Sequence, residues 1–331
     1  MTMREFEYLR PARVAQAIEL VTTDPGAAYL AGGTTLVDLM KDGVLQPRRV
    51  VDVTRLPLRD VIRTDRTVTV GALTTMEQLA AEPVVAERAP VLREALLAGA
   101  STQLRNMATI GGNLLQRARC RYFRDPTVGA CNKRNPGTGC AAVDESARMH
   151  AILGAGEACI ALHASDLAVA LVALDAVVHL QSTSGTRRVP LTEFYRTPGS
   201  SPQRENILEH GQLITAVEIP LPAPGTASEY LKIRDRASYE FALVSVAVAV
   251  DIRDGIIYDA RLGLGGVGTI PWRAYAAESV LRGARPGPEL FRDAAVAEMH
   301  DTFTVPGTAF KVELARRAIE RALSAVSGGT S

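Results

Sequence analysis

Several features that would narrow the function of this 331-residue chain are scarce in its sequence. Aromatic residues make up only 5% of it, with one tryptophan, and the five histidines show no metal-site or triad spacing. The net charge is +1, so charge implies no nucleic-acid and no membrane partner. No apolar run approaches the roughly 18 residues of a membrane span. What remains is an ordinary globular composition, 47% apolar, long enough for two or three domains.

Two further absences bear on compartment and chemistry. The N-terminal residues 1–7 lack the basic and then apolar pattern of a secretory signal, so we expect a cytoplasmic chain. Disulfides are disfavoured in such a reducing compartment. No Gly-x-Ser-x-Gly sequence marks a nucleophile, and we therefore expect no covalent catalysis and assign no catalytic residue.

Cysteine is also scarce, but all four cysteines fall inside one stretch of 40 residues. They are Cys120, Cys131, Cys140 and Cys159. The residues between them are basic and rich in turn-forming Gly, Pro and Asn, which indicates a loop folded around something other than apolar side chains. Gathered thiolates suit zinc or an iron–sulfur cluster. The intervening 10, 8 and 18 residues include no C-x₂-C pair, so zinc, a cluster and four unrelated buried thiols all stay open.

Two glycine turns are the other candidate site. The first follows a predicted strand (28–30) and precedes a predicted helix, and the second has similar chemistry. Their residues are Ala31, Gly32, Gly33, Thr34, Thr35 and Leu36, then Thr109, Ile110, Gly111, Gly112 and Asn113. Paired glycines let backbone N–H groups approach an anion, and a helix start adds its positive end. Either turn alone is as readily a plain tight turn, but two suit a dinucleotide whose pyrophosphate is held from two sides.

A third glycine-rich stretch, residues 263–268, fits G-x-G-x-x-G. It follows a predicted strand, but Ile270-Pro271-Trp272 comes next and no helix opens there. Without a βαβ unit around it, we interpret it as a packed hairpin end and not as a dinucleotide fingerprint.

The apolar pattern divides the chain near the proline-rich residues 220–225. Before them we expect helices at 11–21, 90–98 and 166–174, a βαβ-like unit, and strands at 67–73, 176–181 and 213–219. After them we expect a strand at 230–234, a hairpin turning at Asp254-Gly255, and helices at 274–282 and 312–323. The last hundred residues therefore predict an antiparallel sheet with helices, an α+β unit.

The motifs Ala31–Leu36, Ala108–Asn113 and Val217–Ile219 together resemble the flavin subunits of molybdenum hydroxylases. That family includes xanthine dehydrogenase, carbon monoxide dehydrogenase, 4-hydroxybenzoyl-CoA reductase and bacterial aldehyde oxidoreductases. The resemblance implies an α+β chain with a PCMH/vanillyl-alcohol-oxidase-type FAD-binding domain of two subdomains at 1–222. A smaller α+β domain with an antiparallel sheet, like the C-terminal domain of the carbon monoxide dehydrogenase flavoprotein, would follow at 226–331.

The cysteine stretch then becomes an insertion. In most relatives a Ser-Asp pair follows Ile-Gly-Gly-Asn closely, whereas here Ser165-Asp166 stands more than fifty residues after Asn113. A subset of the family, the periplasmic-type aldehyde oxidoreductase flavin subunits, is similar in carrying a 4Fe–4S cluster in such an insertion. The resemblance thus implies a cluster loop at about 114–165, with Cys120, Cys131, Cys140 and Cys159 as ligands.

The resemblance also implies roles for individual flavin-site residues. The two glycine turns would hold the pyrophosphate and adjoining groups, and Asp166 would approach the ribose or ribityl hydroxyls. Ile214 and Lys232 would lie near the isoalloxazine ring, where a cation stabilises negative charge. Tyr239 would cover a ring face. Without the resemblance, Lys232 is an ordinary solvated lysine on an edge strand.

The implied function is electron transfer through FAD and not substrate chemistry. A large molybdopterin-binding partner would oxidise the substrate, a small partner would carry two 2Fe–2S clusters, and FAD would pass electrons to an acceptor. The complex would be a heterotrimer or larger, and it would be periplasmic if a partner carries a twin-arginine signal. Two alternatives remain, a stand-alone flavoprotein oxidase and a zinc-stapled nucleotide-binding scaffold without a redox role.

Overall fold

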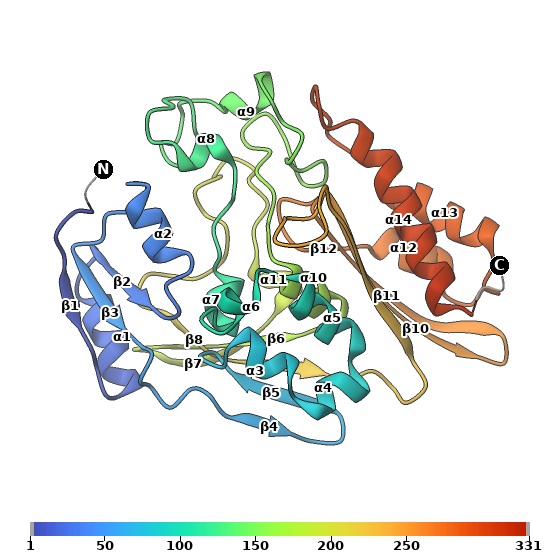
Figure 1. Ribbon diagram of the computed structural model, residues 1–331, viewed down its shortest axis with the longest axis horizontal. Helices are drawn as coiled ribbons and strands as arrows, with labels where there is room; N and C mark the ends of the chain where they lie inside the picture. The colour runs from blue at the N-terminus through green and yellow to red at the C-terminus, as the bar shows by residue number, and fades with distance from the viewer. Residues whose placement is uncertain (1–2, 329–331) are drawn as a thin grey trace.

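The computed structural model describes residues 3–328 and contains three sheets with helices packed around them (Figure 1). Residues 1–2 and 329–331, which end the two predicted domains, lie outside the described residues. The first sheet is parallel, in the order β1-β3-β2, with β1 (Glu7–Leu9), β2 (Ala27–Leu30) and β3 (Arg49–Asp52). Helix α1 (Val14–Thr22) buries Ala17, Ile18 and Val21 in the core of this lobe, and α2 (Leu36–Lys41) connects β2 to β3.

The second sheet is antiparallel and has the order β4-β5-β8-β6-β7. Its strands are β4 (Val61–Arg63), β5 (Thr67–Gly71), β6 (Val177–Ser182), β7 (Gly185–Pro190) and β8 (Leu213–Pro220). The helices around it are α3 (Met76–Ala80), α4 (Pro83–Arg88), α5 (Pro90–Ala98), α6 (Thr102–Arg105), α7 (Ile110–Leu114), α10 (Asp166–Ala173) and α11 (Leu191–Phe194). Helix α10 is buried from Leu167 to Ala173, as expected of a helix that is apolar on every side.

The third sheet is also antiparallel, in the order β12-β11-β10-β9, and belongs to the C-terminal part of the chain. Its strands are β9 (Ala227–Ile233), β10 (Val244–Arg253), β11 (Ile256–Gly265) and β12 (Trp272–Arg273), and its helices are α12 (Tyr275–Leu281), α13 (Pro288–Glu298) and α14 (Phe310–Val326). The β10–β11 turn has positive φ at Asp254 (51°) and Gly255 (74°), which confirms the hairpin predicted from that dipeptide.

The cysteine stretch lies at the top of the molecule in Figure 1 between α2 and α14. Its later part packs into the C-terminal core, where Ile152 is buried and its N–H bonds the Val267 carbonyl at 2.7 Å. The stretch holds only two short helices, α8 (Arg121–Arg124) and α9 (Ala141–Asp144). Its two ends meet, because the Ser165 hydroxyl donates to the Asn113 side-chain oxygen at 2.5 Å. The stretch is therefore an insertion that leaves and re-enters the fold at nearly one point.

The α+β class predicted from the sequence is confirmed, but two element predictions were wrong. Helix α1 begins at Val14 and not at Pro11, because Arg13 keeps extended angles of −131° and 146°. Helix α13 was missed, since its buried residues are Phe291, Ala294, Ala295 and Glu298, which give a weak apolar pattern. Within residues 3–328, no helix is both long and apolar enough to span a membrane.

Candidate functional site

The first glycine turn presents a run of backbone N–H groups that the protein does not use. Within the described residues, the N–H groups of 32–36 have no hydrogen-bond acceptor, while Val37 N–H bonds the Gly33 carbonyl at 3.1 Å. Gly33 holds φ at +75°, a conformation that favours glycine. Free N–H donors on successive residues are the groups from which an anion-binding turn is built.

Gly32 is required for a different reason. A Cβ at this position would lie 1.8 Å from the carbonyl oxygen of Met107, so only glycine lets the two chain segments approach. Met107 immediately precedes the second glycine turn in sequence. The contact thus packs the first turn directly against the segment that leads into the second.

The second turn has no comparable set of free donors. In Ile110–Asn113, Ile110 N–H bonds the Thr74 carbonyl, Gly111 N–H bonds the Ala72 carbonyl, and the other two bond Thr109, at 2.8–3.2 Å. A Cβ on Gly111 would lie 2.9 Å from the Ala72 Cβ. The second turn therefore offers an anion no free backbone N–H group at Ile110–Asn113, although Thr109, Gly111 and Gly112 line the smaller cavity described below. Its contact with a pyrophosphate stays a prediction.

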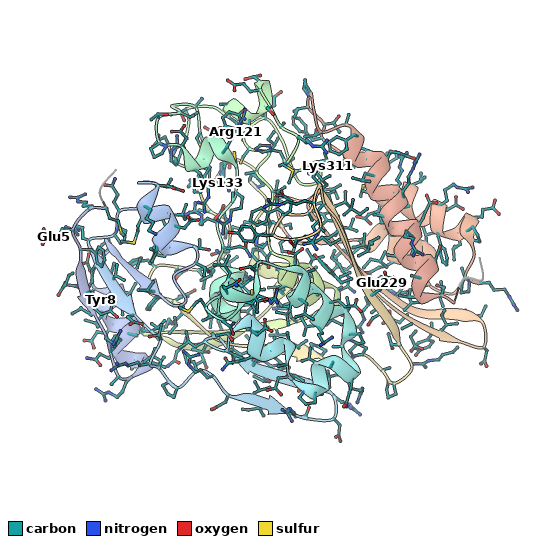
Figure 2. All side chains as sticks on the ribbon, in the orientation of Figure 1. Glu5, Tyr8, Arg121, Lys133, Glu229 and Lys311 are labelled. Atoms are coloured by element: carbon teal, nitrogen blue, oxygen red, sulfur yellow. The ribbon has the colours of Figure 1, made fainter. Side chains whose placement is uncertain are left out.

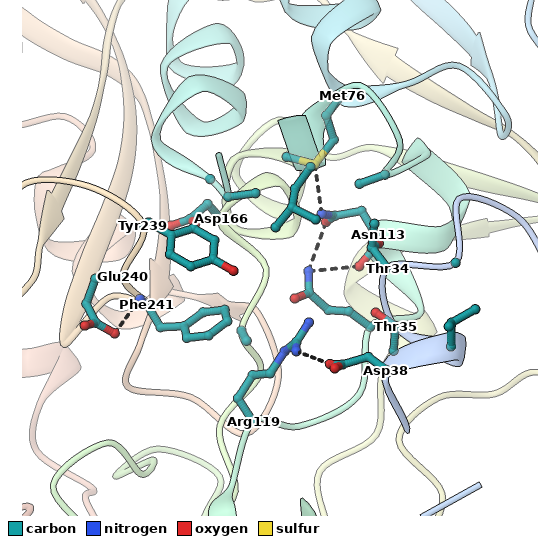
Figure 3. Close-up of a pocket in the computed structure, with 18 of the residues that line it drawn as sticks. Thr34, Thr35, Asp38, Met76, Asn113, Arg119, Asp166, Tyr239, Glu240 and Phe241 are labelled. Carbon is teal, nitrogen blue, oxygen red and sulfur yellow. Dashed lines mark hydrogen bonds and ion pairs between the residues drawn. The ribbon is translucent and has the colours of Figure 1, made fainter. Parts of the chain in front are cut away.

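Two cavities meet at the first turn and share Gly33, Thr34 and Thr35. The larger, about 490 Å³, lies between this turn and the loop that follows β9. Figure 3 shows Tyr239 and Phe241 entering it from one side, opposite Thr34 and Thr35. The smaller, about 240 Å³, is lined mainly by apolar side chains of the first lobe and by both glycine turns. The groove that results is long and has its free N–H donors near the middle.

Lys232 and Asp166 lie in the larger cavity as a buried ion pair. Lys232 Nζ is 2.8 Å from Asp166 Oδ2 and also donates to the Ala98 carbonyl at 3.0 Å. The Tyr230 hydroxyl donates to Asp166 Oδ1 at 2.6 Å, and burial raises the pKa of Tyr230 well above its usual value. The Lys232 side chain is only 5% exposed, so the interpretation as a solvated lysine was wrong.

Ile214 lines the smaller cavity, not the larger one that contains Lys232. The two cavities adjoin at Gly33–Thr35, so the placement of both residues near one ring stays a prediction. Ile214 is buried among the leucine-rich lining of the smaller cavity, near Leu39 and Leu213. Tyr239 does line the larger cavity, is 58% exposed, and has a positive φ of 53°.

Sequence reasoning missed several residues of the larger cavity. Arg119 comes from the cysteine loop, bonds Asp38 of α2 at 2.9 Å, and lies 5.4 Å from the centre of the Phe241 ring. Met76 accepts a 3.3 Å hydrogen bond from the Asn113 amide. No local pattern marks these residues, because each reaches the cavity from a segment distant in sequence.

All four cysteines line one small enclosed pocket and none forms a disulfide. A hydrogen bond from the Cys159 thiol lowers the pKa of Cys140 to about 6, while burial raises the pKa of Cys120 to about 11. Among residues 3–328, however, no group of three or more His, Cys, Asp or Glu side chains has the arrangement needed for a metal ion. Leu39 packs against Cys131 and Cys159 and also lines the smaller cavity, so the cysteine pocket and that cavity are neighbours.

These features define a class of protein, one that binds an extended dinucleotide across two lobes of an α+β fold. Comparison with known families identifies the dinucleotide. Residues 4–222 match the FAD binding domain in molybdopterin dehydrogenase, and residues 229–326 match the CO dehydrogenase flavoprotein C-terminal domain.

Individual relatives agree with the family match. The chain is 45% identical over 324 residues to the aldehyde oxidoreductase FAD-binding subunit PaoB of Escherichia coli K12, covering 97% of this chain and 98% of that protein. It is 28% identical over 292 residues to the glyceraldehyde dehydrogenase medium chain of Sulfolobus acidocaldarius, covering 88% and 86%. A solved carbon monoxide dehydrogenase chain from Hydrogenophaga pseudoflava superposes with a TM-score of 0.78 at 26% identity, covering all of both chains.

The chain therefore belongs to the FAD-binding medium subunits of molybdenum hydroxylases, which are parts of oxidoreductase complexes. This membership argues against a nucleotide-binding scaffold without a redox role. It also favours a subunit over a stand-alone oxidase, because the relatives are named as subunits or medium chains.

Proposed function

We propose that this chain is the electron-transfer subunit of a molybdenum-dependent aldehyde oxidoreductase and holds FAD and a 4Fe–4S cluster. The observation that carries the FAD site is the row of free N–H donors at 32–36, placed where two cavities meet. The aldehyde substrate class is supported by the 45% identical relative, which is named as an aldehyde oxidoreductase subunit. Bound FAD supplies electron storage, because it accepts and returns electrons singly or in pairs.

The two cavities suit different halves of FAD. The larger has polar and aromatic side chains and the Lys232 ammonium, which suit the ring and its polar edge. The smaller is mainly apolar and suits adenosine, so we assign Ile214 to that half. The diphosphate then lies at Ala31–Leu36, and Thr109–Asn113 forms the wall behind it.

The residues around the ring bind and orient it and carry out no bond-breaking step. Lys232 supplies a fixed positive charge whose position is set by Asp166 and the Ala98 carbonyl. Asp166 keeps acceptor capacity for a ribityl or ribose hydroxyl beyond its bonds to Tyr230 and Lys232. Tyr239 and Phe241 line one side of the cavity, where an aromatic face can pack against the ring.

We favour a cluster over a single ion at the cysteine pocket on the chemistry of its ligands. Cys120, Cys131, Cys140 and Cys159 surround one enclosed space, and four thiolates are the usual ligands of 4Fe–4S. A cube of iron and sulfide is larger than one ion, so its ligands stand further apart than the ligands of zinc. The Ala161 N–H donates to the Cys159 sulfur at 3.4 Å, a kind of contact that stabilises the reduced form of such clusters.

The same proposal includes partners that the chain itself does not contain. A large molybdopterin-binding subunit would oxidise the aldehyde, and a small subunit with two 2Fe–2S clusters would deliver electrons to the flavin. An acceptor such as oxygen, a quinone or a protein would then receive them. The complex would be cytoplasmic, or periplasmic if exported with a partner.

An absorption spectrum of the full chain purified without oxygen, with flavin, iron, sulfide and zinc analysis, tests both cofactor assignments. We expect one FAD and about four irons per chain. FAD without iron would contradict the cluster assignment. A chain that holds neither FAD nor iron would contradict the whole proposal.

Two single variants separate the sites. Cys131→Ser should lose most of the iron and keep the flavin, while Gly32→Ala should lose the flavin and keep the iron. Unchanged iron content in Cys131→Ser would exclude this cysteine as a ligand.

A further inference from the structure

One carboxylate, that of Glu205, pairs with a cation that lines the smaller flavin cavity and with a cation that lines the cysteine pocket. Glu205 belongs to the loop after α11, where its carbonyl accepts the Arg196 N–H at 3.0 Å. Its Oε1 is 2.8 Å from Lys133 Nζ, and its Oε2 forms an ion pair with Arg117. Burial opposes the charged form, but Arg117 and Lys133 outweigh it and lower the pKa of Glu205. The carboxylate is therefore charged and shared by two cations.

The two cations face different sites. Lys133 lines the cysteine pocket, is 6% exposed, and also donates to the Pro202 carbonyl at 3.0 Å. Figure 2 shows it on the inner side of the cysteine loop, below the exposed Arg121. Arg117 lines the smaller flavin cavity, and its guanidinium lies 5.0 Å from the centre of the Phe123 ring.

Arg117, Glu205 and Lys133 together are called the bridge. Water screens their charges poorly, so these charges act on both sites. The Lys133 ammonium is almost fully enclosed, and Glu205 and Arg117 are only 20% and 25% exposed. Interactions between buried charges are screened much less than those on the surface. The charge of Glu205 therefore contributes to the electrostatic potential at both sites and so to the ease of reduction there.

We propose that Glu205 is a positioning residue that couples the flavin cavity to the cysteine pocket by holding Arg117 toward one and Lys133 toward the other. This inference rests on the proposed function for its cluster end, whereas its flavin end rests on family membership. The charge of Glu205 then affects the reduction potentials of both redox groups, so that removing this charge shifts the two potentials in the same direction.

The test measures the midpoint potentials of flavin and iron–sulfur group by spectroelectrochemistry in the full chain. Glu205→Gln removes a negative charge with little change of shape, and both potentials should shift in the positive direction. Lys133→Gln should shift the iron–sulfur potential in the negative direction more than the flavin potential. Arg117→Gln should shift the flavin potential in the negative direction more than the iron–sulfur potential. A merely structural role would not produce these opposite signs.

Glu218→Gln is the matched control. Glu218 is 21% exposed and pairs with Arg188 at 2.6 Å, but it lines neither cavity, so both potentials should stay unchanged. A shift of only one potential in Glu205→Gln, or of neither, overturns the bridge while the cofactor assignments stand. Wild-type protein without iron contradicts the cluster assignment and the bridge together, and iron analysis reveals this before any variant is made.

Discussion

The two glycine turns look alike in sequence and behave in opposite ways in the structure. Each has a Gly-Gly pair with threonine beside it, at 31–36 and at 109–113. In the first, the N–H groups of 32–36 have no acceptor within the described residues; in the second, the N–H groups of Ile110–Asn113 are all bonded within the protein. The motif thus specifies a turn, but the neighbouring segments decide whether the turn can bind an anion.

The neighbours differ because the turns sit at different depths. The first turn leaves the edge of a small parallel sheet and borders two open cavities. The second turn is pressed onto Ala72 and Thr74 after β5, which take up its donors. Four experiments test this difference between the turns, and the largest effect is expected at Gly32.

Gly32→Ala should nearly abolish flavin binding. The added Cβ would lie 1.8 Å from the Met107 carbonyl oxygen, so the first turn must move away from the second. Flavin absorbance per purified chain measures the loss. Gly129→Ala is the control, because nothing lies within 4 Å of its Cβ, and full flavin occupancy in Gly32→Ala would contradict the packing of the two turns.

Gly111→Val should destabilise the fold before it affects the flavin directly. Its Cβ would lie 2.9 Å from the Ala72 Cβ, and overpacking of this kind costs about 1–3 kcal/mol. The free energy of unfolding of the flavin-free chain, from urea titration, checks this. If the flavin-free stability were unchanged while flavin was lost, the pyrophosphate itself would occupy the space at Gly111, as the sequence alone suggested.

Amide hydrogen exchange should distinguish the turns without any mutation. In flavin-free protein the N–H groups of 32–36 should exchange quickly, and FAD should slow them by about tenfold or more, because they gain acceptors. The N–H groups of 110–113 should be protected in both states. Equal protection of both turns in flavin-free protein would contradict the claim that only the first turn has free N–H groups.

Thr109→Ala should have the smallest effect. The Thr109 hydroxyl accepts the Gly112 N–H at 3.2 Å and caps the short helix α7. Loss of such a cap costs about 1 kcal/mol, and flavin binding should persist because the second turn contributes shape and not donors. Urea titration and flavin content measure the two effects, and loss of most flavin would show that this turn contributes more than a wall.

Much of the fold could be predicted because its signals are local. The hairpin at Asp254-Gly255 follows from residues that tolerate positive φ, and the capping box of Thr75 and Gln78 at the start of α3 depends on a similarly local pattern. Helix α13 was missed because Phe291 is the one large apolar side chain among its buried residues. The candidate residues of both turns were also found, but their different hydrogen bonding could not be.

Local sequence is enough to predict the α+β class, the two glycine turns and the grouping of every cysteine in one insertion, because each depends on neighbouring residues. The tertiary fold sets which N–H groups stay free. The carbonyl groups of Ala72 and Thr74 accept N–H groups of the second turn, and they lie far from it along the chain. The tertiary fold also decided that Lys232 is buried against Asp166, 66 residues away, and that Glu205 joins Lys133 to Arg117. Pairings of charges over such separations arise from packing, and no local pattern encodes them.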